Sequence, residues 1–381
     1  MLRRFLPSTT LFARRFFMSS PVPTKKQKTT MSPVIATHSG QFHADEALAV
    51  FMLKQLPKYA DASVLRTRDL TILNSDAVDI VVDVSAKYDG VKYFDHHQRE
   101  FVDTLGLEGT HDTIRLSSAG LVYKHFGKDV IKHILLSQGA EEISEAEITA
   151  DLLDTLYVKT YANFVEAIDA NDNGISVYDK TELETISPPK YKDFAITLPA
   201  VVSRLNPRPA QVAAKGDEFV DAQFAKASEL MGLAFVDQVL QLALSWYPAK
   251  QHVIKAFAPE TRKALDPKGR ILFFADQVNW KAHLEEVEQQ AAQDPAAEGL
   301  EPVLYVVYLA GPNDWRVQAV EKATFVSRKA LPEPWRGVRD EALSELSGVP
   351  GCTFVHASGF IGGNKTKEGA LELAKKAADW E

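Results

Sequence analysis

The first hundred residues alternate between short hydrophobic runs and polar turns, which predicts strands followed by helices. Residues 32–40 (SPVIATHSG) read as a buried strand that ends in a polar turn, and residues 45–56 (DEALAVFMLKQL) place hydrophobic side chains at helical spacing. Residues 77–85 (AVDIVVDVS) are hydrophobic enough for a strand buried on both faces, as in parallel sheets. VLRTRD and, after an Asp-Gly turn, VKYF are further strand candidates. This alternation predicts an α/β domain with a largely parallel sheet flanked by helices.

The pattern changes along the rest of the chain. Helical periodicity continues through SSAGLVYKHFG and the acidic segment that follows, up to one long helix at residues 211–244. Beyond it, QHVIKAF, RILFFAD, PVLYVVYL and WRVQAV read as strands, and GCTFVHASGFIGGNKTKEGALELAKKAADW reads as a strand, a glycine-rich loop and a closing helix. Residues 285–302 read as a helix and loop inside this second α/β region. We therefore expect a leader (1–31), an N-terminal domain (32–210), a connecting helix (211–247) and a smaller C-terminal α/β domain (248–381).

Composition narrows the class of protein. The chain has 381 residues, of which 45% are hydrophobic, and no hydrophobic run reaches the roughly 18 residues of a membrane span, so we expect no membrane partner. Its single cysteine, Cys352, excludes an internal disulfide framework and a cysteine zinc cluster, which is typical of a reducing compartment. The residues before Asp45 carry seven basic side chains and no acid, so the remainder has a net charge of −15. Such an acidic body would bind nucleic acid only through a local groove or divalent metal ions.

The N-terminal segment MLRRFLPSTTLFARRFFMSS alternates arginines with hydrophobic residues and lacks acids. This composition is typical of a mitochondrial presequence, although a disordered tail would look similar. The basic cluster PTKKQKTT that follows is a weak nuclear address, and initiation at Met18 or Met31 would remove the arginine-rich part. We therefore expect the mitochondrial matrix, with a nuclear or nucleolar pool as a second location.

Polar side chains gather where predicted strands and helices end. Ligands of open α/β sheets collect at the carboxyl ends of the strands, so we expect these clusters to converge. A single Asp after a strand is usually a helix cap, and a single His is usually structural, but several acidic clusters in one half of a chain repel one another unless a cation is present. The clusters are His38 with His43 and Asp45, then Asp83, then Asp95-His96-His97, and finally Asp169 and Asp172.

The mixture of carboxylates and imidazoles indicates a metal site. These ligands suit Mn²⁺, Mg²⁺, iron or Zn²⁺, and the absence of thiolates argues against a purely structural zinc site. About six ligands exceed what one tetrahedral ion needs. Two metal ions roughly 3.5–4 Å apart form the arrangement that stabilises the attacking and leaving oxygens of a phosphoryl centre.

An ordered set of motifs along the chain resembles a known family. DHH at residues 95–97, an Asp at the end of a buried strand and an N-terminal HxxxxHxD resemble the DHH phosphoesterase superfamily. More closely, over residues 34–381, the chain resembles the melanocyte proliferating gene family of exonucleases. The motifs that carry this second resemblance are THSGQFHADEALA, YFDHHQREF, DANDNGI, SRLNP, WRVQAV, LPEPWRG and VHASGFIGGNKTKEGAL.

The resemblance implies roles for individual residues. Asp83 would bridge the two metal ions, and His97 would face the substrate as a proton donor or oxyanion stabiliser. The first motif departs from the superfamily pattern, since His43 occupies the middle acidic position and His38 lies one residue further back, which leaves the role of His38 open. We choose Asp169 over Asp172 as the last ligand because Asp172-Asn173-Gly174 reads well as a turn. The full expected ligand set is His38, His43, Asp45, Asp83, His96 and Asp169.

Further residues are substrate candidates. GFIGGNKT departs from a phosphate-binding P-loop by one residue, but a flexible loop before a helix would still present amides to an anion. In the superfamily the equivalent loop of the second domain, which would be DHHA1-like here, contacts the substrate. The SRLNP motif offers phosphate or sugar contacts or plain helix-break residues, and three aromatic residues, Trp315, Trp335 and Phe360, either stack bases or belong to the core. The expected substrate-binding residues are Arg204, Asn206, His356, Gly362, Gly363 and Lys365.

Together these observations predict a two-metal phosphodiesterase that removes nucleotides from one end of single-stranded RNA, with DNA as an alternative substrate. Mn²⁺ is the expected ion and Mg²⁺ the alternative. The 3′-to-5′ polarity is implied by the resemblance alone. A pyrophosphatase or polyphosphatase would use the same ligands with a strongly basic substrate pocket, and a non-catalytic RNA-binding protein would keep the fold without the metals.

Overall fold

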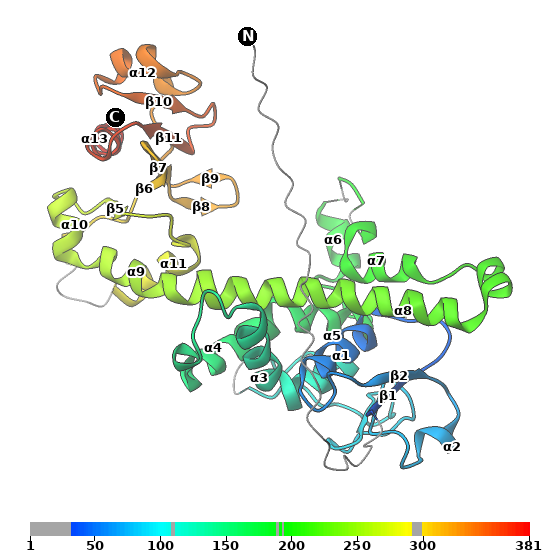
Figure 1. Cartoon of the computed structure of the whole chain (residues 1–381). Coiled ribbons are helices and arrows are strands. Elements are labelled where there is room, and N and C mark those ends of the chain that lie inside the picture. Colours follow the sequence, from blue (N-terminus) through cyan, green and yellow to red (C-terminus); the bar gives the residue numbers. More distant parts are fainter. Residues whose placement is uncertain (1–31, 108–110, 188–189, 193, 292–298) are drawn as a thin grey trace, which may run out of the picture. The chain divides into compact units, whose positions relative to one another are not determined.

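The computed structural model describes residues 32–107, 111–187, 190–192, 194–291 and 299–381. Pro33–Glu381 form one compact unit, whose helices and strands are labelled in Figure 1. The expected leader, residues 1–31, lies outside the described residues, and so do the targeting signals expected there. Most of the loop expected after the helix in residues 285–302 also lies outside them.

Four parallel strands form the first sheet, in the order β2-β1-β3-β4. They are β1 (Val34–Thr37), β2 (Ser63–Arg66), β3 (Ile80–Val82) and β4 (Tyr93–Phe94). The predicted parallel sheet is thus confirmed. The central strand β3 is buried along its whole length, as its continuous hydrophobic run predicts. Because β1, β3 and β4 run in the same direction, the polar residues that follow them emerge at one edge of the sheet.

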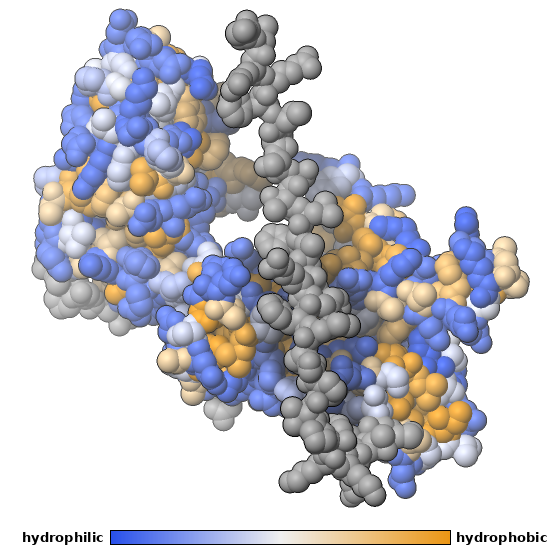
Figure 2. Space-filling view, viewed as in Figure 1, coloured by the Kyte–Doolittle hydropathy of each residue, from blue (hydrophilic) through white to orange (hydrophobic). Residues whose placement is uncertain are grey.

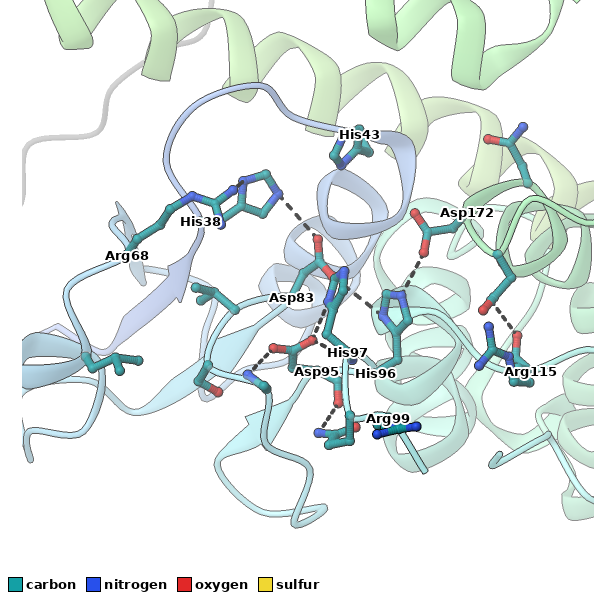
Figure 3. Close-up of a pocket in the computed structure, with 17 residues that line it drawn as sticks. His38, His43, Arg68, Asp83, Asp95, His96, His97, Arg99, Arg115 and Asp172 are labelled. Carbon is teal, nitrogen blue, oxygen red and sulfur yellow. Dashed lines mark hydrogen bonds and ion pairs between the residues drawn. The ribbon is translucent and has the colours of Figure 1, made fainter. Parts of the chain in front are cut away.

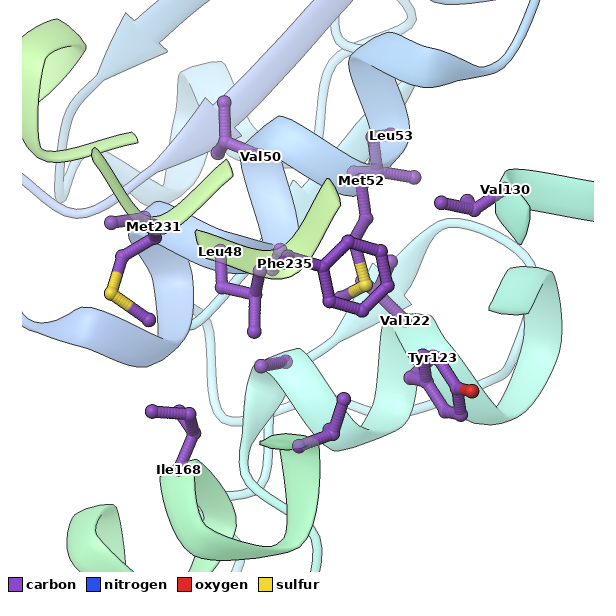
Figure 4. Close-up of a cluster of buried hydrophobic side chains, with 14 of the residues drawn as sticks. Leu48, Val50, Met52, Leu53, Val122, Tyr123, Val130, Ile168, Met231 and Phe235 are labelled. Atoms are coloured by element: carbon purple, nitrogen blue, oxygen red, sulfur yellow. The ribbon is translucent and has the colours of Figure 1, made fainter. Parts of the chain in front are cut away.

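Helices flank this sheet and supply most of the core. They are α1 (Ala44–Gln55), α2 (Leu70–Leu73), α3 (Ser118–Gln138), α4 (Ala150–Thr160), α5 (Glu166–Asp172), α6 (Lys180–Ile186), α7 (Leu198–Leu205) and α8 (Pro209–Leu240), with the short 3₁₀ turns η1 (Glu145–Glu147) and η3 (Phe194–Ile196) and the π-helical turn η2 (Tyr161–Val165). Helix α1 packs against both α3 and α8, and Leu48, Met52 and Phe235 are fully buried in the core that they share (Figure 4). Each such side chain contributes about 1.5–3 kcal/mol by leaving water.

Helix α8 approaches α1 closely because Gly232 has no side chain. A Cβ atom at Gly232 would lie 2.1 Å from the ring of Phe51, which faces it from α1. This contact packs α8 against α1, and α1 begins at the polar residues of the first motif.

A stretch that includes α6 and η3 exposes many large hydrophobic side chains. The residues are Ile175, Val177, Tyr178, Leu183, Ile186, Tyr191, Phe194 and Ile196. Figure 2 shows hydrophobic residues in several patches on this face, one of them near α6 and α7. An exposed concentration of this kind is typical of a surface that another molecule covers.

One long helix connects the two sheets. Helix α8 continues through the π-helical turn η4 (Gln241–Trp246) into α9 (Tyr247–Phe257), so the predicted connecting helix is confirmed and extends further, with a kink at Gly216, where φ is 71°. The strand prediction for QHVIKAF is wrong, because these residues belong to α9 and bury Val253, Ala256 and Phe257 at helical spacing. The helix passes a length and hydropathy test for a membrane span, but half of the hydrophobic window is buried inside the protein, as in a core helix.

The second sheet is mixed, with the order β10-β11-β7-β6-β5. Only β5 and β6 pair in parallel, and the other neighbours are antiparallel. The elements are β5 (Ile271–Phe274), β6 (Tyr305–Gly311), β7 (Asp314–Ala319), β10 (Cys352–Val355) and β11 (Ile361–Asn364), the small hairpin β8 (Glu321–Ala323) and β9 (Val326–Ser327), the helices α10 (Pro259–Leu265), α11 (Lys281–Ala291), α12 (Asp340–Ser347) and α13 (Lys367–Asp379), and the 3₁₀ turn η6 (Glu333–Trp335). This confirms the expected second α/β region.

A buried ion pair fixes the start of β5, and its removal should destabilise the protein. Arg270 donates to both oxygens of Asp266, at 2.8 and 2.9 Å, and to the exposed Asp379. Burial alone would raise the pKa of Asp266, but the hydrogen bonds from Arg270 outweigh it and lower the pKa. Asp266→Ala should therefore lower the free energy of unfolding at pH 7 by about 3–5 kcal/mol, since it leaves Arg270 without its buried partner.

Urea unfolding monitored by circular dichroism measures this loss. Asp379→Ala is the matched control, and its effect should stay below about 1 kcal/mol because that carboxylate is exposed. The stabilisation from Asp266 is present above the ordinary carboxyl pKa of about 4 and is lost as the pH falls through the lowered pKa of the folded state. Equal effects of the two variants at pH 7 would contradict this assignment.

Candidate metal centre

The polar residues that follow β1, β3 and β4 converge on one pocket, together with the end of α5. The pocket has a volume of about 1020 Å³, which exceeds the space that metal ions alone require. It is lined by His38, His43, Asp83, Asp95, His96, His97 and Asp172, among others (Figure 3). The acids and imidazoles form three overlapping groups; within each group the ligand atoms lie within 4.8 Å of one another and could hold a metal ion. Residues separated by more than 130 positions in sequence thus form one site.

The first motif contributes the most deeply buried members. His38 Nε2 lies 3.0 Å from Glu46 Oε1 and 3.3 Å from Asp83 Oδ2, and all three residues are buried. His43 caps the N-terminus of α1, and its backbone N–H donates to Glu46 Oε1. Burial lowers the pKa of His38, but its hydrogen bonds with Asp83 and Glu46 outweigh burial and raise the pKa to about 10. The pocket therefore favours positive charge at this position.

Asp83 occupies the middle of the cluster. Its Oδ2 faces His38, and its Oδ1 lies 3.6 Å from both His96 Nδ1 and His97 Nδ1 and accepts a hydrogen bond from Ser118 at the first turn of α3. The backbone at Asp83 is left-handed, with φ of 58°, which is costly for a residue other than glycine and is typical of functional sites. A carboxylate with one oxygen toward each half of the site is well placed to bridge two cations.

The three residues of the DHH triplet make different contacts. One oxygen of Asp95 accepts hydrogen bonds from the backbone N–H of His97 and from its Nδ1, the latter at 2.7 Å. The second oxygen accepts a hydrogen bond from the backbone N–H of Ala86. Asp95 thus orients His97. This hydrogen bond raises the pKa of His97, against the opposing effect of partial burial. His96 turns the other way, and its Nε2 lies 2.9 Å from Asp172 Oδ2.

The buried carboxylate of Asp45 indicates whether cations fit this site. Its side chain is 1% exposed, and neither carboxylate oxygen has a hydrogen-bond donor among the described residues; the same is true of Glu46 Oε2. Burial, and then the carboxylates of Asp83 and Asp172, raise the pKa of Asp45 well above its usual value. Buried, unpaired carboxylate oxygens in the same small volume keep their negative charge only beside a positive partner, and otherwise take up a proton. The donor set, with oxygens and imidazole nitrogens, therefore fits divalent cations.

The structure differs from the sequence prediction at the last ligand. Asp169 is fully buried, and its oxygens accept hydrogen bonds from the backbone and hydroxyl of Ser117, the backbone of Gly120 and the hydroxyl of Tyr161. Burial raises the pKa of Asp169 to about 7 despite these donors. Its oxygens are thus committed to joining α3 to α5. Asp172, one helical turn later, reaches His96 and Asp45, so Asp172 replaces Asp169 in the ligand set that we propose.

Glu46 is a member of the cluster that sequence reasoning missed. Its position in the first turn of a helix has an ordinary explanation, because acidic residues there stabilise the helix dipole. A signal was nevertheless present in the sequence: Glu46 follows the N-cap residue His43 by three positions, which is the spacing of a capping box. A capping carboxylate beside a candidate metal ligand must point toward the same loop.

Asn206 of the SRLNP motif positions the first motif. Its amide oxygen accepts the N–H of Phe42 at 2.9 Å, and its amide nitrogen donates to the carbonyl of Phe42 at 2.8 Å. The structure thus engages Asn206 with the backbone next to His43, which differs from the predicted substrate contact. Arg204 donates to the carbonyl of Ala195, and its role as a substrate contact stays a prediction.

Asn206→Ala should weaken Mn²⁺ binding about tenfold or more, the size of effect seen when a group that orients a metal ligand is removed. Isothermal titration of the full chain measures the dissociation constant. Excess Mn²⁺ should restore most of the metal occupancy, because the ligands themselves remain. An unchanged dissociation constant would contradict the positioning role of Asn206.

The glycine-rich segment of the C-terminal part is a strand. Gly362 and Gly363 lie in β11, between β10 and β7, so the prediction of a flexible anion-binding loop is wrong. A Cβ at Gly363 would lie 2.6 Å from Thr353 Oγ1 and 2.8 Å from Arg316 Nη1, which shows why glycine is needed in this packed sheet. His356 and Lys365, at the two ends of this segment, are exposed. Their contact with substrate stays a prediction.

The three aromatic candidates differ in exposure. Trp335 is 1% exposed and belongs to the core of the second sheet, so it cannot stack on a base. Trp315 is partly buried and stacks on Phe273. Phe360 is 37% exposed and packs against His356, so it alone of the three presents a large free surface.

Comparison with known proteins gives a consistent family. The family model for MYG1 exonuclease, described as "Uncharacterised protein family (UPF0160)", matches residues 34–378. The chain is 49% identical to a MYG1 protein of Schizosaccharomyces pombe over 350 residues, which cover 91% of this chain and 97% of the relative. It is 41% identical to the human MYG1 exonuclease over 388 residues, covering 98% of this chain and 94% of the relative. No solved structure matches the chain significantly. The chain therefore belongs to the MYG1 exonuclease family.

Proposed function

We propose that the protein is a divalent-metal-dependent phosphodiesterase of the DHH type that removes nucleotides from the 3′ end of single-stranded RNA. The observation that carries this proposal is the buried, unpartnered carboxylate of Asp45 beside Asp83, whose two oxygens face the two halves of the cluster. The names of several relatives as exonucleases support hydrolysis of nucleic acid. The 3′-to-5′ polarity and the preference for RNA over DNA are part of the proposal.

The chain's residues take distinct parts in this reaction. Two ions, Mn²⁺ in our proposal, would be held by His38, His43, Asp45, Asp83, His96 and Asp172, all of which belong to the overlapping groups of candidate ligand atoms. Bound divalent cations would supply Lewis-acid stabilisation of phosphate charge and a water of lowered pKa. His97 shares its Nδ1 with Asp95, which leaves its Nε2 available on a side chain that is 59% exposed. We assign His97 to donate a proton to the leaving oxygen.

The mixed sheet at the C-terminal end is, in our proposal, a DHHA1-like domain that binds the substrate strand. His356, Lys365 and Phe360 are its exposed candidates for this contact. We also propose a mitochondrial matrix location with a nuclear pool, on the composition of residues 1–31. Fluorescent fusions of the full chain and of a chain begun at Met18 should differ in location.

The proposal is tested by offering the purified full chain, with Mn²⁺ or Mg²⁺, three substrates: 5′-labelled single-stranded RNA, pyrophosphate and a dinucleotide. Stepwise shortening of the labelled RNA with release of mononucleotides supports the proposal. Turnover of pyrophosphate alone would instead identify a pyrophosphatase, and inactivity on all three substrates would favour a non-catalytic RNA-binding protein.

A further inference from the structure

Three arginines line the same pocket as the acidic cluster. They are Arg68, Arg99 and Arg115, and Figure 3 shows Arg68 on the side of His38 and the other two on the side of His96. Guanidinium groups stay charged at any physiological pH and match phosphate oxygens in geometry. Each of these arginines can therefore bind either a protein group nearby or a phosphate of the substrate.

Arg68 is already engaged by the protein. Its Nε donates to the carbonyl of Ser39 at 3.1 Å, and its Nη2 lies 3.2 Å from His38 Nδ1. These contacts fix the first motif and orient the ring of His38 toward Asp83. Arg68 therefore acts on the centre through His38.

Arg99 extends from a loop that is fixed at both ends. The side chain of Gln98 donates to the carbonyl of Asp95 at 2.9 Å, and Phe101, which is 7% exposed, donates its N–H to the carbonyl of Gln98 at 3.1 Å. Phe101 also packs against the ring of His96. Arg99 itself is exposed, and it lies three residues after His96 in this hydrogen-bonded loop.

Arg115 is tied to the other side of the ligand set. Its carbonyl accepts a hydrogen bond from Asn173 Nδ2 at 3.0 Å, and Asn173 directly follows Asp172. Its neighbour Leu116 is fully buried and anchors the segment. The guanidinium is exposed and makes one long contact, 3.4 Å from Nη1 to the carbonyl of Phe101, which is the residue that ends the Arg99 loop. The two arginines are thus presented by adjoining segments.

We propose that Arg99 and Arg115 form a subsite for the phosphate adjacent to the scissile one, so that the pocket selects a chain with at least two consecutive phosphodiesters. This inference rests on the proposed function and names the part of the substrate that the pocket reads. The acidic cluster needs cations before it can accept a phosphate, whereas the arginines attract one directly. A substrate with a single phosphate engages only the acidic cluster with its cations, whereas an oligonucleotide also engages the two arginines.

The test compares two substrates under the same Mn²⁺ concentration, with the full chain. A labelled single-stranded RNA decamer contains consecutive phosphates, and bis(p-nitrophenyl) phosphate contains one. Arg99→Gln and Arg115→Gln should each lower kcat/KM on the RNA about tenfold, mostly through KM, and the loss on the small diester should be at least about fivefold smaller. Each variant should also reduce the salt dependence of log KM for RNA by about 0.7, the slope expected for one lost contact with a single-strand phosphate.

Matched variants complete the experiment. Lys226→Gln removes one positive charge from the exposed face of α8 and should leave both substrates unaffected. Arg99→Lys should recover part of the RNA activity, since lysine keeps the charge but loses the bidentate geometry. Equal losses on RNA and on the small diester, with wild-type Mn²⁺ content, would overturn the subsite while leaving the proposed function intact. A wild type that hydrolyses neither substrate would overturn both.

Discussion

Asp83→Asn should reduce RNA hydrolysis by at least about 10³-fold, which corresponds to about 4 kcal/mol of lost transition-state stabilisation. Asparagine preserves the size of the side chain but carries no charge, and only one of its two terminal atoms can bind a cation. Because the two oxygens of Asp83 face opposite halves of the cluster, one half loses its ligand atom in this variant and both halves lose the negative charge. Initial rates on labelled RNA at saturating Mn²⁺ measure the effect.

The control for this variant is Asp76→Asn, the same chemical change at an exposed position a few residues before β3. It should keep wild-type activity. Thermal unfolding of both variants shows whether the loss is local, and Asp83→Asn should remain folded because the change removes repulsion among buried carboxylates. A folded Asp83→Asn protein with more than one tenth of the wild-type rate would contradict the bridging role.

Asp172→Asn and Asp169→Asn should have different effects, the first on Mn²⁺ binding and the second on stability, although the two positions lie one helical turn apart. Asp172 lies against His96 and Asp45 in the pocket, so its substitution should lower Mn²⁺ affinity and the hydrolysis rate by about 10²-fold or more. Among the described residues, the side chain of Asp169 accepts hydrogen bonds from Ser117, Gly120 and Tyr161, so Asp169→Asn should keep its Mn²⁺ content. Asp169→Asn should instead lower the free energy of unfolding by about 1–3 kcal/mol, because an amide cannot accept a hydrogen bond from every donor around this position.

Metal analysis of the two purified variants, together with urea unfolding, measures both effects. Wild-type Mn²⁺ affinity in Asp172→Asn together with lost Mn²⁺ in Asp169→Asn would restore the assignment that the turn signal in the sequence favoured. Loss of Mn²⁺ in both variants without any change in stability would also contradict the structural role that we give to Asp169.

The sequence predicts the parts of this protein in which local pattern and tertiary environment agree. The buried run before Asp83 has one interpretation, a central parallel strand, and the polar residues after three such strands must meet at one edge. That reasoning finds His38, His43, Asp83 and His96 without any structure. The prediction of a long connecting helix succeeds for the same reason, since the helical period continues over many turns.

The predictions that fail are those in which two interpretations share one local pattern. QHVIKAF is too short to distinguish a strand from a helix, and its place in α9 is set by packing against the second sheet. The two glycines of β11 resemble a loop, but they are required by close contacts with Arg316 and Phe354, which are distant in sequence or on a neighbouring strand. The choice between Asp169 and Asp172 depends on the directions in which these two side chains of α5 point, which the local sequence pattern does not give.

The most direct test of the central claim is to locate the cations. Crystals of the full chain grown with Mn²⁺ and measured near the manganese absorption edge should show two anomalous peaks, one on each side of the Asp83 carboxylate, with Asp45 and Asp172 contributing oxygens. A map without a peak near Asp83, at a Mn²⁺ concentration that supports hydrolysis, would contradict the account.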